Sequence, residues 1–252
     1  MQNKLFVLDL ETTGFDEVFD RVVAITIYDL NLEDYSYKKI YDEIIWQDIT
    51  QDFVKNCWIV EQGYYTLEEI NRGKDQSLVI KEVDALLTNQ MATSYNTSFD
   101  FDKFIIRQWK IKTVKVPYCL MLESTDIVRI PWYDYEGNFT GYKWPKLPEA
   151  YYYFYNERMP EKHRSSYDTE LAVKIAIALD KYKKHFYLIL ESLKTQKELI
   201  IIYTSKKRET LERKIKPLQI KEEQTQVEAF DYLRQENRTF AIGRRSEIKE
   251  IE

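Results

Sequence analysis

The sequence predicts an α/β domain followed by a small β module. Strand-like apolar runs and segments with helical spacing succeed one another up to about residue 190, as they do in α/β folds. From residue 198 onward the pattern changes to short strands divided by polar turns, which is typical of small β domains. We therefore predict two domains, residues 1–190 and residues 191–252.

The first elements are strands. Residues 4–12 and 21–30 predict consecutive strands on either side of a turn at residues 14–20, and residues 36–46 predict a third strand. Helical spacing follows in two pieces over residues 66–89. The apolar stripe of the second piece consists of Val79, Val83, Leu86 and Leu87.

Strand and helix then alternate. Residues 90–96 predict a short strand, and residues 98–109 predict a helix with Ser98 as its N-cap. The buried stripe of this helix consists of Phe101, Phe104 and Ile105. Further helices are predicted at residues 146–156, 165–186 and 185–196, and the tail strands are predicted at residues 199–205, 210–220, 226–233 and 238–243.

Size and charge limit the class of protein. The chain has 252 residues, 44% of them hydrophobic, which is enough to bury a core. Its net charge of −5 hides an asymmetry, because residues 181–252 carry 17 Lys and Arg against 12 Asp and Glu. Residues 1–180 are therefore acidic overall, and an acidic domain is poorly suited to tight nonspecific DNA binding. It is better suited to phosphate contact through metal ions, helped by the basic tail.

The sequence also bears on location. No apolar run approaches the ~20 residues of a membrane span, and the chain enters a strand without a charged leader and cleavage site. We therefore expect a cytoplasmic protein without a membrane partner.

The first strand ends in two acids within LFVLDLETTG, residues 5–14. Alternate residues of a strand point to the same face, so Asp9 and Glu11 point together while Leu8 and Leu10 point the other way. Two like charges on a buried face need a compensating cation. Taken alone, the pair also fits an edge strand with one face in solvent, so acids elsewhere must decide between the two interpretations.

Two further acids stand at comparable positions, Asp100 and Asp168, each on the first turn of a predicted helix. Four carboxylates suit two divalent cations, Mg²⁺ or Mn²⁺, which together can clamp a phosphodiester. His163 would supply a proton acceptor, because imidazole titrates near neutral pH. The alternatives are a helix-terminal carboxylate for Asp100, as for Asp102 beside it, and a surface loop histidine for His163.

Three short motifs carry a family resemblance: DLETTG, YNTSFD and HRSSYD. Together they resemble the exonuclease motifs of the DEDDh exonucleases, a family that includes the proofreading exonuclease subunit of bacterial DNA polymerase III. The resemblance spans residues 5 to about 181 and implies a ribonuclease H-like fold, a mixed five-stranded sheet flanked by helices. It implies Asp9, Glu11, Asp100 and Asp168 as metal ligands and His163 as general base. The tyrosine subclass is excluded, because Arg164 stands where that subclass carries tyrosine.

The same resemblance implies the reaction and its substrate contacts. The reaction would be 3′ to 5′ hydrolysis that releases nucleoside 5′-monophosphates. We expect single-stranded 3′ ends as substrate, DNA rather than RNA, and a polymerase or repair partner, although the 2′-hydroxyl contact that separates RNA from DNA is not legible in the sequence. The substrate contacts would be Thr12, Thr13, Phe15 and Asn96, with Phe15 as a wedge against the terminal base. Thr12 and Thr13 are alternatively just the end of a strand.

The tail is similar to a WYL-type module, a small SH3-like β barrel, over residues 198–220 and 227–244. This second resemblance implies a nucleic-acid or nucleotide ligand held by Arg213, Arg238 and Phe240. Solvated strand charges are an equal alternative for the two arginines. For the whole chain, the rival to an active exonuclease is a noncatalytic sensor that uses the nuclease fold as a docking platform.

Overall fold

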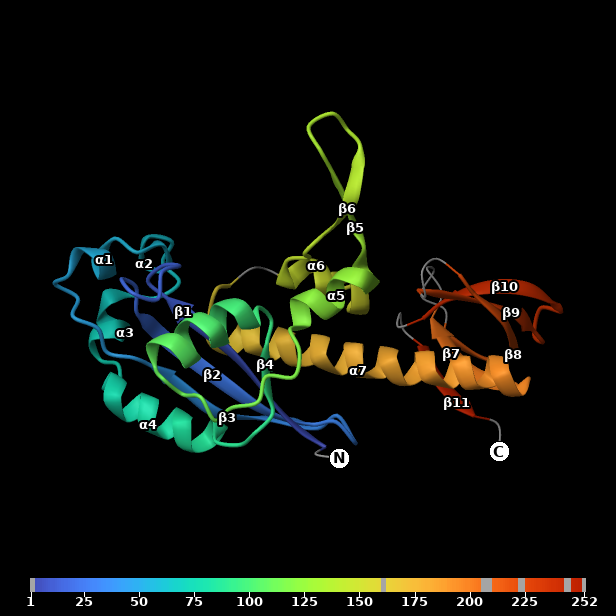
Figure 1. Cartoon of the computed structure of the whole chain (residues 1–252), viewed down its shortest axis with the longest axis horizontal. Coiled ribbons are helices and arrows are strands. Elements are labelled where there is room, and N and C mark those ends of the chain that lie inside the picture. Colours follow the sequence, from blue (N-terminus) through green and yellow to red (C-terminus); the bar gives the residue numbers. More distant parts are fainter. Residues whose placement is uncertain (1–2, 160–161, 205–209, 222–224, 243–245, 251–252) are drawn as a thin grey trace. The chain divides into compact units, whose positions relative to one another are not determined.

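The computed structural model describes residues 3–159, 162–204, 210–221, 225–242 and 246–250 (Figure 1). The chain forms two compact units. The first unit comprises Met1–Ala150 and Met159–Ala176, and the second comprises Tyr151–Arg158 and Ile177–Glu252. Helix α7 (Ser165–Thr195) contributes its beginning to the first unit and its remainder to the second. The division into domains at residue 190 stays a prediction.

The first unit contains a mixed sheet. Its strands are β1 (Lys4–Thr12), β2 (Val22–Asn31), β3 (Tyr37–Ile44) and β4 (Ala92–Ser94), in the order β3-β2-β1-β4. Strands β2 and β3 pair antiparallel to their neighbours, whereas β4 is parallel to β1. The three N-terminal strands and the short fourth strand lie where the sequence predicts them.

The expectation of five strands is wrong for the described part of this sheet, which has four. Beside β4 the chain makes only one isolated parallel bridge, between Met91 and Lys115. Backbone bonds flank the bridge, from Ala92 N to Lys115 O and from Lys115 N to Gln90 O, each 2.9 Å long. Pro117 follows two residues later and has no N–H to extend the ladder.

Helices connect and follow the strands of this sheet in the chain (Figure 1). In chain order the helices of the first unit are α1 (Asp52–Lys55), α2 (Trp58–Glu61), α3 (Leu67–Asn71), α4 (Gln76–Leu87), η1 (Ser98–Gln108) and α5 (Leu120–Val128); α6 (Leu147–Tyr155) begins in the first unit and continues into the second. The predicted stripes of α4 and η1 pack in one core cluster with Phe6, Leu8 and Leu10 of β1. Thus the sheet and these two helices bury a common apolar core.

Helix η1 differs from its prediction in two ways. It has π-type hydrogen bonding, which Trp109 N continues by donating to Phe104 O at 2.8 Å. Ser98 lies inside the helix, and the N-cap residue is Thr97, whose side chain makes no capping bond. The assignment of Ser98 as N-cap is therefore wrong.

Three features of the first unit were not expected: the short helices α1 and α2, helix α5, and a hairpin of β5 (Ile130–Tyr133) and β6 (Phe139–Lys143). The segment from α1 to α3 has a small core of its own against β2. The buried members of this core are Val23, Ala24, Val54, Cys57, Ile59, Tyr65 and Ile70. This packing holds the segment on the sheet.

The second unit contains an antiparallel sheet. Its strands are β7 (Leu199–Thr204), β8 (Thr210–Lys221), β9 (Gln226–Asp231), β10 (Glu236–Ala241) and β11 (Ser246–Glu250), in the order β10-β9-β8-β7-β11. Four of these strands were predicted, and β11 was not. Ile189 of α7 lines a small apolar cavity with Ile201, Ile215 and Val227 of the sheet. The SH3-like description of this unit stays a prediction.

None of the helices in the described ranges combines the length and the apolar character that crossing a bilayer requires.

Candidate metal centre

Strand β1 carries Asp9 and Glu11 on one of its two faces. Leu8 and Leu10, on the opposite face, are buried in the core of the first unit. In the neighbouring β2, Thr26 lies opposite Asp9, and Ala24 lies opposite Glu11. Because residues paired across strands share a face, the acids lie on the same side of the sheet as Thr26.

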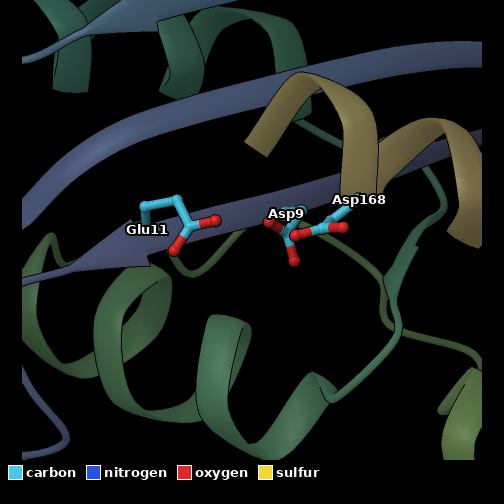
Figure 2. A group of neighbouring side chains, drawn as sticks. All are labelled: Asp9, Glu11 and Asp168. Carbon is cyan, nitrogen blue, oxygen red and sulfur yellow. The ribbon is translucent and has the colours of Figure 1, made fainter. Parts of the chain in front are cut away.

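Helix α7 begins over this side of the sheet. Oγ of Ser165, the first residue of α7, lies 3.0 Å from Oγ1 of Thr26. Asp168 follows on the first turn, and Figure 2 shows its carboxylate beside that of Asp9. Ligand oxygens of Asp9, Glu11 and Asp168 all lie within 4.8 Å of one another. The fold thus brings together three of the predicted metal ligands.

Asp100 approaches the same cluster from η1. Strands β1 and β4 are parallel, with Leu8 opposite Ser94, so the chain that leaves β4 passes beside the end of β1. Asp100 is 3% exposed, and its charge raises the pKa of both Asp9 and Glu11. It lies outside the group of closest oxygens, but it belongs to the same electrostatic cluster.

Burial and mutual repulsion oppose ionisation of these carboxyls. Loss of hydration is the largest cause: it raises the pKa of Asp9, raises that of Glu11 to about 8 and raises that of Asp100 to about 7. The neighbouring carboxylates raise the pKa values of Asp9 and Glu11 further. Polar groups around Asp100 offset part of its shift. A bound cation would favour the ionised form of every one of them.

The donor set fits a divalent cation. Carboxylate oxygens are the ligands that Mg²⁺ and Mn²⁺ prefer, and three carboxylates here are close enough to share one ion. Nitrogen or sulfur ligands, which would favour zinc, are absent from this group. The cluster therefore has the chemistry of a hard-cation site.

A positively charged side chain at the edge of the cluster, that of Arg164, is not indicated by the sequence pattern. The charge of Arg164 lowers the pKa of Glu11. Its guanidinium lies 4.4 Å from the ring centroid of Tyr65, and its Nη2 donates to Oε1 of Glu69 at 2.9 Å. Glu69 lies 95 positions earlier in the chain, so no local pattern could have connected the two residues.

His163, the predicted general base, directly precedes Arg164 and is half-buried. Its ring centroid lies 4.7 Å from that of Trp58 and 4.8 Å from that of Tyr64. Its backbone φ of +42° lies in the left-handed region. The structure thus gives His163 aromatic neighbours that the sequence does not indicate, and its role as proton acceptor stays a prediction.

Two predicted substrate contacts, Thr12 and Thr13, are buried where β1 turns into a tight loop. Thr12 Oγ1 donates to Gly14 O at 2.6 Å, and Thr13 Oγ1 donates to Asp20 Oδ1 at 3.0 Å. A Cβ atom on Gly14 would lie 2.5 Å from the Asp20 carboxylate. The close approach of Asp20 therefore explains the glycine.

The other two predicted substrate contacts are Phe15 and Asn96. Phe15 is 81% exposed, with its ring centroid 6.0 Å from that of Phe99. The Asn96 carbonyl accepts hydrogen bonds from the backbone N–H groups of Phe99 and Asp100, each at 3.0 Å. Asn96 thus helps to start η1, while the Phe15 ring is open to solvent; contact of either residue with substrate stays a prediction.

The three residues proposed for the tail ligand have different environments. Arg213 is buried and pairs with the fully buried carboxylate of Asp231. Phe240 is also buried, with its ring centroid 5.3 Å from that of Tyr203. Arg238 is exposed and pairs with Glu236 at 3.0 Å. Arg213 and Phe240 thus have interior partners in the second unit, and a ligand role for the three stays a prediction.

Comparison with known proteins identifies the fold. No family model and no curated protein matches the sequence. E. coli exonuclease I in complex with a dT13 oligonucleotide matches with a TM-score of 0.56 and 13% identity, over 91% of this chain and 55% of that one. Its complex with a 5cy-dT13 oligonucleotide matches with a TM-score of 0.51 and 14% identity, over 92% and 55%.

A third structure, apo exonuclease I, matches with a TM-score of 0.51 and 12% identity, over 99% of this chain and 64% of that one. This chain therefore spans between 55% and 64% of the length of these three structures. At such low identity the likeness concerns the fold. The chain has a mixed α/β fold similar to that of exonuclease I.

Proposed function

We propose that this chain is a metal-dependent 3′ to 5′ exonuclease that acts on single-stranded nucleic acid, DNA in preference to RNA. The observation that carries the proposal is the gathering of Asp9, Glu11 and Asp168, with Asp100 in electrostatic contact, in an exonuclease I-like fold. Buried like charges are unfavourable unless a cation compensates them. A docking platform without catalysis has no use for this repulsive cluster.

In this proposal the four carboxylates hold two divalent cations, Mg²⁺ or Mn²⁺. When bound, such ions supply Lewis acidity, which activates water at neutral pH and neutralises charge on the leaving oxygen. Arg164 lowers the pKa of Glu11 and so helps to keep that ligand ionised.

His163 is the proposed proton acceptor. The oxygen of the attacking water bonds to phosphorus while a ring nitrogen of His163 takes the water proton. The bond between phosphorus and the 3′ oxygen of the preceding nucleotide breaks, and that oxygen keeps the electron pair and becomes a hydroxyl on protonation. The products are a nucleoside 5′-monophosphate and a strand shortened by one nucleotide.

Single-stranded DNA is the proposed substrate for two reasons. Two solved structures of similar fold hold the oligonucleotides dT13 and 5cy-dT13. In this chain, the exposed ring of Phe15 follows the loop at the end of β1 and offers a stacking surface for the terminal base. Thr12 and Thr13 would line the same position through their backbone.

The test is degradation of oligonucleotides labelled at the 5′ end: single-stranded DNA, duplex DNA and RNA. We expect a ladder of stepwise shortened products from single-stranded DNA with Mg²⁺ or Mn²⁺, none with EDTA, and nucleoside 5′-monophosphates on chromatography. Binding without shortening under all of these conditions would contradict the proposal and support the noncatalytic docking platform.

A further inference from the structure

Two aromatic rings and the imidazole of His163 form a mutual cluster in the first unit. The ring of Trp58 meets the imidazole at 80° and that of Tyr64 meets it at 60°, both edge to face. The two aromatic rings also touch each other, with centroids 5.2 Å apart. We call Trp58 and Tyr64 the aromatic cage. Such edge-to-face contacts have preferred geometries, so the cage restricts how the imidazole can turn.

The backbone on the C-terminal side of His163 is tied to the same segment as the cage. Arg164 pairs with Glu69 at 2.9 Å and lies over the ring of Tyr65. The backbone N–H of Ser165 donates to the Tyr65 hydroxyl at 3.2 Å. Consecutive residues 163, 164 and 165 are thus each held by a residue between positions 58 and 69.

The cage is itself anchored to the sheet. Ile59 and Tyr65, the neighbours of Trp58 and Tyr64 in sequence, are buried against Val23 and Ala24 of β2. Ala24 lies opposite Glu11 of the acidic cluster. The segment that holds His163 is therefore fixed to the strand next to β1, which carries two of the metal ligands.

The backbone of His163 has an uncommon conformation. A φ of +42° is rare for residues other than glycine, although histidine adopts it more often than most. Such conformations persist where the surroundings over-determine them, and they gather at functional sites. Here the cage and the contacts of Arg164 and Ser165 hold His163 in this conformation.

We infer that Trp58 and Tyr64 are positioning residues, which hold the imidazole of His163 in the orientation that proton transfer requires. This inference rests on the proposed function. A misplacement of about 1 Å can cost about 100-fold in rate, so loss of the cage should lower kcat while KM for the oligonucleotide changes little. The cage would act through His163 and not through the substrate.

The experiment is a double-mutant cycle in the full chain. It combines Trp58→Ala and Tyr64→Ala, with and without His163→Ala, and measures kcat and KM on single-stranded DNA. The conservative pair Trp58→Phe and Tyr64→Phe keeps two rings. Trp46→Ala is the matched control, because Trp46 is 46% exposed against 49% for Trp58 and lies outside the cage. Thermal unfolding of each variant checks the fold.

We expect His163→Ala to lower kcat by about 10²–10⁴-fold and loss of the cage to lower it by about 10-fold or more. In the His163→Ala protein, loss of the cage should cause no further decrease. The phenylalanine pair should restore most of the rate, and Trp46→Ala should match the wild type. An equal decrease with and without His163, or no decrease at all, would overturn the inference.

A spectroscopic readout separates this inference from the proposed function. The chain has two histidines, His163 and His185, so their imidazole NMR signals are assigned with a single His163→Ala spectrum. Ring currents of the cage should shift the His163 signals away from ordinary positions, and loss of the cage should return them there, with His185 as internal reference. Unshifted His163 signals would overturn the cage itself. An unchanged kcat in His163→Ala together with shifted signals would remove His163 as the base, and with it the positioning role, and would leave the cage as a structural contact only.

Discussion

The carboxyls of the candidate metal centre are costly to ionise without a cation. Glu11 and Asp100 have pKa values of about 8 and about 7 because burial removes their hydration. Their charges, with those of Asp9 and Asp168, repel one another. Cation binding, protonation of these carboxyls and stability of the folded chain must therefore be linked.

This linkage predicts a pH dependence of stability. In the folded chain Glu11 binds a proton up to about pH 8, whereas its ordinary pKa is 4.5; the free energy of unfolding without metal should therefore fall as pH rises through this window. The proposed cation would bind the ionised form, so Mg²⁺ should stabilise the protein more at about pH 8 than at about pH 6. Thermal unfolding with Mg²⁺ and with EDTA measures both effects. Glu11→Gln should flatten the pH dependence in EDTA, and an equally steep dependence in that variant would contradict the assignment.

Asp100 and its neighbour Asp102 should differ in their effect on kcat. Asp100 is buried and interacts with the cluster, whereas Asp102 is exposed. If Asp100 is a metal ligand as proposed, Asp100→Asn should lower kcat by about 10²-fold or more, because it would remove a charge that helps to hold the cations. Asp102→Asn makes the same chemical change two positions along the helix and should leave kcat near that of the wild type. Equal effects of the two variants would indicate that Asp100 is a helix-terminal carboxylate without a role in the metal centre.

The loop between β1 and β2 is bonded to itself and to η1 at the end of the strand that carries Asp9 and Glu11. The carboxylate of Asp20 accepts bonds from the Thr13 hydroxyl and the backbone N–H of Asp16. Lys103 and Gln108 of η1 donate to backbone carbonyls of the same loop. The loop thus connects the strand that carries Asp9 and Glu11 to the helix that carries Asp100.

Gly14→Ala tests this loop. The new Cβ atom would meet the Asp20 carboxylate at 2.5 Å and displace it, which should destabilise the chain by about 1 kcal/mol through the loss of its bonds with Thr13 and Asp16. Urea unfolding measures the loss, and nuclease assays should show a lower kcat. Asp20→Ala creates the missing space, so the effect of Gly14→Ala should shrink in that background. An unchanged effect would place the strain elsewhere.

Charge is distributed unevenly along the chain. Residues 181–252 carry 17 Lys and Arg against 12 Asp and Glu, within a chain of net charge −5. The exposed cations of the second unit include Lys214, Arg234 and Arg238. A polyanionic substrate should interact favourably with this part of the chain at low salt.

Changing Lys214, Arg234 and Arg238 together to glutamine should therefore raise KM for a long single strand at low salt. Turnover of a dinucleotide, which carries few phosphate charges, should change little. The difference in KM should shrink at high salt, where the attraction is screened. The matched control changes three exposed lysines of the first unit, Lys38, Lys55 and Lys112. Equal KM values for the long strand before and after the first triple change would refute substrate attraction by the second unit.

Local sequence pattern was sufficient for much of this protein. Alternation in β1 assigned Asp9 and Glu11 to one face, and helical spacing identified the buried stripes of α4 and η1, because both signals depend on residues a few positions apart. The positions of four tail strands followed from their β-branched runs and polar turns. The three acidic motifs could be found one by one along the chain, and their resemblance to the DEDDh exonuclease motifs implied the nuclease-like cluster.

Contacts between distant parts of the chain settled the rest. The described part of the sheet has four strands, and beside β4 the pairing is limited to one isolated bridge between Met91 and Lys115, which lie far apart in the sequence. Arg164 reaches Glu69, and His163 meets Trp58 and Tyr64, across about a hundred residues of chain. Such contacts arise from the packing of the α1 to α3 segment on β2, and periodicity, which reports only neighbours in sequence, carries no information about them.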